Sequence, residues 1–242
     1  MVLPQRIKEF KSPSTHVYKF KLLNQERVLE HNNEKCVGCG LCIHACPITG
    51  KVISWGTTHE EYIVIDLVKC VHCGVCAYFC PSGALKLFIN GEERIELKEN
   101  VEQLERHSLP DLEPVMLGRT TTGAPILKYL QGTLKIPDKL EPSESMNAMK
   151  ACPTGALSQA GNRIVLDENK CFYCDACSHA AGGKIVPIRT RLLIDFKDGV
   201  SPIVTRIIER MMDEQAASRI LKGASGYKAR EKTKLLIDHL GE

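Results

Sequence analysis

The sequence predicts an α+β protein built from small modules, each with a strand, a cysteine-rich loop, a short helix and a second strand, followed by a helical C-terminal extension. Three observations predict this fold. The twelve cysteines fall into regularly spaced sets, and a short unit of sequence around these sets recurs. Aromatic residues make up only 5% of the 242 residues, which is low for one large apolar core. We therefore expect several small cores, each centred on a cysteine set.

The cysteines form three sets of four. Two sets have the complete spacing C-x-x-C-x-x-C-x-x-x-C followed by proline, and the third is split into a lone Cys-Pro and a later triad. A 4Fe–4S cluster takes four thiolates, so twelve cysteines serve three clusters with none left over. The sets are Cys36, Cys39, Cys42 and Cys46; Cys70, Cys73, Cys76 and Cys80; and Cys152, Cys171, Cys174 and Cys177.

The repeated unit can be followed along the chain. A Lys-Cys pair opens each triad, and β-rich segments at 62–66 and 163–167 precede two of the triads. Asn90-Gly91 lies between apolar segments at 87–89 and 95–97, which is typical of a two-residue hairpin turn. Each unit is therefore expected to run from a strand through a cluster loop and a short helix to another strand.

The cysteine sets also divide the chain into parts. Residues 1–32 are an N-terminal extension, in which alternating apolar and lysine residues predict a short half-buried strand at 18–22. Residues 33–90 contain the two complete sets, and residues 146–197 contain the split set. The polar, proline-containing residues 91–145 are expected to be an insertion or linker with some helix around 97–104.

Residues 198–242 are expected to form the helical extension. Ser201-Pro202 is typical of a helix start, and an apolar stripe follows at helical spacing. Packing of this stripe on the rest of the chain and packing on a partner both remain open. The stripe comprises Ile203, Val204, Ile207, Ile208, Met211 and Met212.

The spacing also predicts how the sets are shared between clusters. Three thiolates two residues apart wrap one face of a cluster, and the fourth cysteine is carried away by a short helix to the neighbouring cluster. Cluster one is then expected to use Cys36, Cys39, Cys42 and Cys80; cluster two to use Cys70, Cys73, Cys76 and Cys46; and cluster three to use Cys171, Cys174, Cys177 and Cys152.

On the doubled set and its Cys-Pro endings, residues 33–90 resemble a bacterial-type two-cluster ferredoxin. The split set resembles a degenerate copy of the same module that has kept one cluster. In a complete copy, the cysteines of the lost cluster would stand where this chain has Pro142, Ser145, Ala148 and Ala181. A three-iron form of the third cluster is expected if Cys152 does not reach it.

The three-cluster arrangement with a long insertion resembles archaeal polyferredoxins. This resemblance implies an electron-transfer subunit of an anaerobic oxidoreductase complex, such as a hydrogenase, heterodisulfide reductase or formylmethanofuran dehydrogenase. A free-standing ferredoxin-type carrier and a reductive activator enzyme are the alternatives. Because no dinucleotide or P-loop pattern and no spare cysteine nucleophile is found, we expect no catalytic site of the chain's own.

Charge and composition restrict the partners and the compartment. The formal charge of +3 treats cysteines as neutral; with thiolates and cluster cores counted, the loaded protein would carry about −3, which supports no nucleic-acid partner. A secreted disulfide framework and structural zinc are the alternative uses of the cysteines. The chain has no apolar signal-peptide core and no run of about 18 apolar residues. We expect a reducing cytoplasmic setting, with peripheral association to a membrane complex left open.

Several residues near the cysteines are candidates for tuning the clusters. Gly40 and Gly74 follow the second cysteine of their triads, where a small residue lets the loop approach the cluster closely. In the third triad, Asp175 stands at the matching position. It is expected either to share the backbone conformation of the two glycines and tune the cluster by its charge, or to be an exposed loop carboxylate. His72 and Tyr173 lie between cysteines and are expected to pack or to contact a partner. The remaining two candidates, His44 and His179, are expected at surface helix positions.

Overall fold

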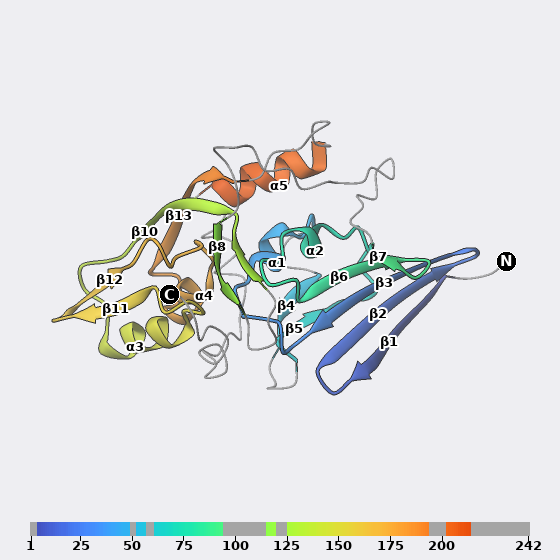
Figure 1. Ribbon diagram of the computed structural model, residues 1–242, viewed down its shortest axis with the longest axis horizontal. Helices are drawn as coiled ribbons and strands as arrows, with labels where there is room; N and C mark the ends of the chain where they lie inside the picture. The colour runs from blue at the N-terminus through green and yellow to red at the C-terminus, as the bar shows by residue number, and fades with distance from the viewer. Residues whose placement is uncertain are drawn as a thin grey trace.

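The computed structural model describes residues 4–48, 52–56, 61–93, 115–119, 125–193 and 202–213. The expected helix at 97–104, the expected strand at 95–97 and most of the C-terminal extension lie outside these residues. In the described part, short strands and a few short helices alternate, which agrees with a ferredoxin-type α+β fold (Figure 1).

A five-stranded antiparallel sheet contains the N-terminal residues. Its strand order is β1-β2-β3-β6-β7, with β1 at Gln5–Ser12, β2 at Thr15–Leu22, β3 at Gln25–Asn32, β6 at Leu85–Ile89 and β7 at Glu92–Glu93. We expected one short strand near 18–22, and the structure has three strands before residue 33. Strand β3 is hard to recognise in the sequence because two of its inward positions, Arg27 and His31, are polar yet buried.

The hairpin expected at Asn90-Gly91 is confirmed. Both residues have positive φ, 50° and 86°, and the register pairs Ile89 with Glu92 across a two-residue turn. Asparagine and glycine adopt this backbone at low cost, so the local sequence is enough to specify the turn. Strand β3 pairs with β6, which joins the N-terminal strands to the cysteine-rich residues that follow them.

The first two triads each lead into a short helix. Helix α1 (Leu41–Ala45) carries Cys42 and ends at Cys46, and helix α2 (Val75–Tyr78) carries Cys76. Between the triads, β4 (Ile53–Trp55) pairs with β5 (Ile63–Ile65) in a small hairpin.

The second half of the chain has its own strands and helices. Strand β8 (Val115–Arg119) pairs with β9 (Pro125–Lys128), β10 (Leu130–Lys135) with β13 (Val186–Leu192), and β11 (Leu157–Ala160) with β12 (Arg163–Leu166). Helix α3 (Pro142–Ala151) packs against α4 (Ala176–Ala180). Within the described part of 91–145, β10 pairs with a strand beyond the third triad, and α3 spans residue 146, where we expected a boundary.

Helix α5 (Pro202–Met212) starts at the expected proline and lies along both halves of the molecule (Figure 1). It contacts α1 and β13. Ile207 and Met211 are buried, and Ile208 and Met212 pack at the margin of the same core. This part of the apolar stripe therefore packs on the chain itself.

Candidate metal centres

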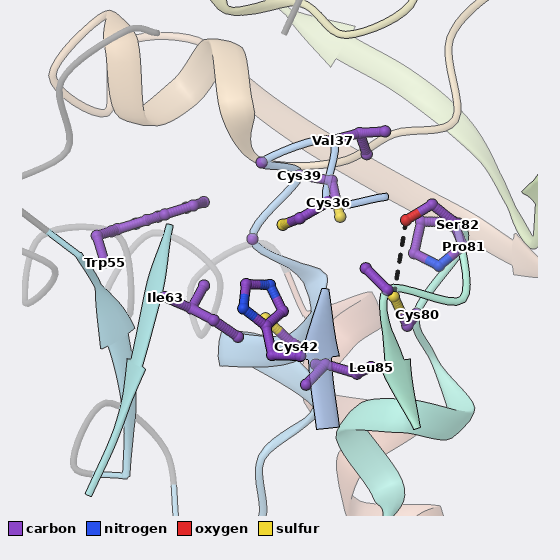
Figure 2. Close-up of a pocket in the computed structure, with 14 residues that line it drawn as sticks. Cys36, Val37, Cys39, Cys42, Trp55, Ile63, Cys80, Pro81, Ser82 and Leu85 are labelled. Atoms are coloured by element: carbon purple, nitrogen blue, oxygen red, sulfur yellow. Dashed lines mark hydrogen bonds between the residues drawn. The ribbon is translucent and has the colours of Figure 1, made fainter. Parts of the chain in front are cut away.

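The twelve cysteines line three cavities, four at each. The first cavity, of about 340 Å³, has three cysteines of the first triad on one side and the last cysteine of the second set on the other (Figure 2). Its walls include Val37, Trp55, Ile63 and Leu85, and the fully buried His31 also lines it. We call this the first site; its cysteines are Cys36, Cys39, Cys42 and Cys80.

The second cavity, of about 360 Å³, shows the reciprocal exchange. Its cysteines come from the second triad and from the C-terminal end of α1, and they are Cys46, Cys70, Cys73 and Cys76. The third cavity, of about 280 Å³, gathers Cys152, Cys171, Cys174 and Cys177. We call these the second and third sites. The structure thus brings together the same groups of four that the spacing suggested, and Cys152 reaches the third cavity.

None of the twelve cysteines, all of which lie in described parts of the chain, forms a disulfide. Among the described residues, no three His, Cys, Asp or Glu side chains are arranged to hold one metal ion. Each cavity is instead lined by four cysteines, which is the number of thiolates that a cubane cluster takes.

Burial strongly disfavours free thiolates at these sites. It raises the pKa of Cys46 and Cys171 to about 12 and that of Cys70 to about 11. Burial also raises the pKa of five further thiols well above the usual value, and these are Cys39, Cys42, Cys76, Cys174 and Cys177. Thiolates therefore need a strong local positive charge, which bound iron would supply.

The loops that carry the triads repeat one backbone pattern. The residue before the second cysteine has positive φ in all three loops: 66° at Gly38, 51° at His72 and 54° at Tyr173. The residue after it has positive φ at Gly40 (75°) and Gly74 (79°). These left-handed residues turn the backbone tightly around the cavity, as we expected for the two glycines.

Asp175 departs from this pattern. Its φ is −105°, so the expectation that it shares the glycine backbone is wrong. It is also fully buried, which excludes an exposed loop carboxylate. Its Oδ2 lies 2.8 Å from Nη2 of Arg189 and 2.8 Å from Nε2 of His44. Burial alone would raise the pKa of Asp175, but Arg189 and His44 outweigh it and hold the pKa below its usual value.

The two histidines expected at the surface also lie elsewhere. His44 is fully buried beside Asp175, because α1 is covered by α5 and by the third triad. His179 is half-buried, and the indole N–H of Trp55 donates to its Nε2 over 3.3 Å. Burial lowers the pKa of His179 to about 4, so its ring is neutral at pH 7.

Two buried arginines hold the loops of the second and third sites, and sequence reasoning missed both. Arg27 of β3 donates to the carbonyl of His72 over 3.2 Å, and Arg189 of β13 donates to the carbonyl of Tyr173 over 2.9 Å. His72 and Tyr173 are equivalent positions in the repeat, and both are buried. The sequence feature that could have identified them is an arginine at an inward position of a strand with alternating apolar residues. Such an arginine is unusual unless its charge is paired.

Each site has three cysteines from one triad and a fourth, its lone cysteine, from another part of the chain. At two of the three sites, a side-chain hydroxyl lies near the lone cysteine. Ser82 Oγ lies 3.9 Å from Cys80 Sγ (Figure 2), and Thr154 Oγ1 lies 3.6 Å from Cys152 Sγ. The equivalent residue after Cys46 is Ile48, which has no hydroxyl. The second site therefore lacks this interaction with its lone cysteine.

A complete copy of the two-cluster module would have four further cysteines, three of them on another triad loop. In this chain the corresponding positions lie on helices or at a helix end. Pro142, Ser145 and Ala148 belong to α3, and Ala181 is the C-cap of α4. Ala148 and Ala181 are fully buried in the core that surrounds the third site. Helix α3 therefore stands where a complete copy would have a triad loop.

Residues 35–84 match the family model described as "4Fe-4S dicluster domain". This segment, with the first two sites, is a 4Fe–4S ferredoxin-type domain. A search of the curated proteins found no match to the chain. The described residues contain no helix that is long and apolar enough to cross a membrane.

Among solved structures, the chain is similar to one in the "Formate dehydrogenase - heterodisulfide reductase - formylmethanofuran dehydrogenase complex from Methanospirillum hungatei (dimeric, composite structure)". The TM-score is 0.62, and the alignment covers 86% of this chain and 92% of that chain. Sequence identity is 18%, so the likeness is one of fold.

Proposed function

We propose that this chain is an iron–sulfur electron-transfer subunit that holds three 4Fe–4S clusters. The observation that carries the proposal is that all twelve cysteines line three cavities in sets of four. Each cluster supplies one-electron redox chemistry when bound. The proposed ligands are Cys36, Cys39, Cys42 and Cys80 at the first site; Cys46, Cys70, Cys73 and Cys76 at the second; and Cys152, Cys171, Cys174 and Cys177 at the third.

The proposed organisation is two ferredoxin-like modules in tandem. Residues 33–90 form the two-cluster module, with residues 1–32 adding strands to its sheet. A degenerate single-cluster module includes the split set within 146–197, and the pairing of β10 with β13 favours extending it to begin near residue 130. The pairs β4–β5 and β11–β12 and the matching loops support this repeat.

The protein's own contribution is to hold the thiolates and to exclude water. The cavity walls at the first site are mostly apolar, and three of its four cysteines are buried. A buried site of low dielectric constant lowers the reorganisation energy of electron transfer. Backbone N–H groups, such as that of Tyr173 at 3.4 Å from Cys171 Sγ, stabilise the thiolate charge.

We place the subunit within an oxidoreductase complex of the anaerobic kind, such as a hydrogenase, heterodisulfide reductase or formylmethanofuran dehydrogenase. The fold likeness to a chain of one such complex supports this assignment. A free-standing carrier is the second candidate. A reductive activator would need a cluster with an incomplete ligand set open to substrate, and four cysteines at every cavity argue against that.

Metal analysis tests the cluster assignment. Protein purified without oxygen should contain about twelve iron atoms and about twelve acid-labile sulfides per chain. Cys36→Ser, Cys70→Ser and Cys171→Ser should each reduce the iron content and disturb the signal of one site only. About eight iron atoms in the unmodified protein would refute the third cluster, and stoichiometric zinc would refute the scheme.

Purification from the native host separates the two functional candidates. A subunit should co-purify with a catalytic partner in a defined ratio and should exchange electrons with it. A chain that elutes alone with its full iron content at every ionic strength tested would instead identify a free carrier.

A further inference from the structure

The loops of the first and third sites touch each other. The backbone N–H of Asp175 donates to the carbonyl oxygen of Cys39 over 3.1 Å. A Cβ placed on Gly40 would lie 3.8 Å from the Cβ of Asp175, so the two loops approach each other closely at that point. Cys39 and Cys174 directly adjoin these contact residues in the sequence.

The cysteines of the three sites are divided between two hydrophobic cores. Cys39 shares one core with all four cysteines of the third site, whereas Cys42 and Cys80 share another core with cysteines of the second site. The first site thus has one cysteine in the core around the third site and two in the core around the second site.

Asp175 is fixed from both halves of the molecule. His44, on α1 between Cys42 and Cys46, comes from the N-terminal half, and Arg189, on β13, comes from the C-terminal half. All three side chains are fully buried. The carboxylate is therefore a fixed point between the two halves, next to the loop contact.

We infer that the first site is the middle one of the three and that Asp175 is the positioning residue that holds the third site against it. This inference rests on the proposed function. With clusters held by the cysteines of the three sites, one electron would pass from a reduced site to an oxidised neighbour, in the order third, first, second or the reverse. A redox protein at one end of the series supplies the electron, and a second redox protein accepts it at the other end.

One observation defines the competing order. Cys73 of the second site packs at the margin of the core around the third site. If that contact were the closer one, the second site would be the middle one. The two orders predict opposite results when single sites are removed.

The test uses three variants of the full chain, each lacking one site: Cys36→Ser with Cys42→Ser, Cys70→Ser with Cys76→Ser, and Cys171→Ser with Cys177→Ser. Iron content first verifies that each variant keeps two clusters, about eight atoms. Electron paramagnetic resonance of the fully reduced proteins then measures coupling between the remaining spins. We expect coupling without the second site and two isolated signals without the first. Coupling that survives loss of the first site but not of the second would overturn the inferred order.

The role of Asp175 is tested in the variant that lacks the second site. Asp175→Asn, and separately Asp175→Leu with Arg189→Met so that no buried charge is left alone, should abolish the resolved splitting between the first and third sites. Asp167→Asn, on an exposed turn before the third triad, is the control and should leave the splitting intact. Unchanged splitting in both Asp175 variants at full iron content would overturn the positioning role. Iron below about eight atoms in the control would refute the proposed clusters instead.

Discussion

Arg189 and Asp175 form an ion pair that is closed off from solvent. Their Nη2 and Oδ2 atoms are 2.8 Å apart, and both side chains are fully buried. The same guanidinium donates to the carbonyls of Tyr173 and Met211, over 2.9 Å and 3.0 Å. The Arg189 side chain thus joins the loop of the third site, the Asp175–His44 pair beside the first site and the C-terminal end of α5.

Removal of Arg189 alone should destabilise the protein severely. Arg189→Met leaves the Asp175 carboxylate buried without its strongest partner, which costs about 3–5 kcal/mol, whereas Arg189→Met with Asp175→Leu should recover most of that loss. The measurement is the midpoint of thermal unfolding under anaerobic conditions, followed by far-UV circular dichroism. Arg191→Met, an exposed position on the same strand, is the control. A double variant no more stable than Arg189→Met would contradict this account.

Gly40 should tolerate alanine far less well than other left-handed glycines. At Gly40 an added Cβ would meet Trp55 Cζ2 at 2.9 Å, and the Trp55 ring is held edge-on against His179. Gly161, in the β11–β12 turn, also has positive φ but open space around its Cβ. Gly161→Ala should therefore cost only the backbone strain, about 1–2 kcal/mol.

Gly40→Ala should cost more than that and should also reduce iron at the first site, because the loop must move away from the cavity. Thermal unfolding and iron content of the two variants, compared side by side, check this. Equal losses of stability with full iron in both would show that the contact with Trp55 is unimportant.

The three cysteine triads could be recognised in the sequence because the spacing within each triad is a local property. Three cysteines with two residues between each pair can direct their thiols to one bound cluster. Likewise, Asn90-Gly91 specifies its turn without contacts from the rest of the chain. The burial of His44 was not predictable in the same way. It depends on α5 and the third triad covering α1, and these segments lie more than a hundred residues further along the sequence.

The environment of Asp175 shows the same limit. The repeat placed it correctly beside the second cysteine of its triad, but its backbone conformation follows from Arg189, His44 and the Cys39 carbonyl. Strand β3, one of the two strands before residue 33 that we did not expect, escaped recognition for a related reason. Buried Arg27 has its guanidinium satisfied by the His72 carbonyl, so its polarity conceals an inward position.

The hydroxyls of Ser82 and Thr154 should raise the reduction potentials of their sites. A hydroxyl that donates to a ligand sulfur stabilises the more negative, reduced state. Thr154→Val keeps the side-chain shape and should lower the potential of the third site, and Ser82→Ala should lower that of the first. The second site, which has Ile48 at this position, is the internal control in the same redox titration. A shift of all three potentials together would indicate a general change of structure.

Arg210 should raise the potential of the second site in a different way, through charge. Its guanidinium donates to the carbonyls of His44 and Cys46, at 2.9 Å for Cys46, where α1 ends. Although burial dominates the pKa of the Cys46 thiol, Arg210 acts in the opposite direction and lowers it. A positive charge that favours thiolate also favours the reduced cluster, because both carry more negative charge.

Arg210→Met should therefore lower the potential of the second site more than that of the third. Arg206→Met changes an exposed arginine one turn earlier on α5 and is the matched control. A redox titration of each protein, monitored by electron paramagnetic resonance, gives the potentials of the separate sites. Because Arg206 lies toward solvent, screening should leave its effect small. An equal shift in the two variants would mean that the net charge of α5, rather than the contact at Cys46, sets the potential.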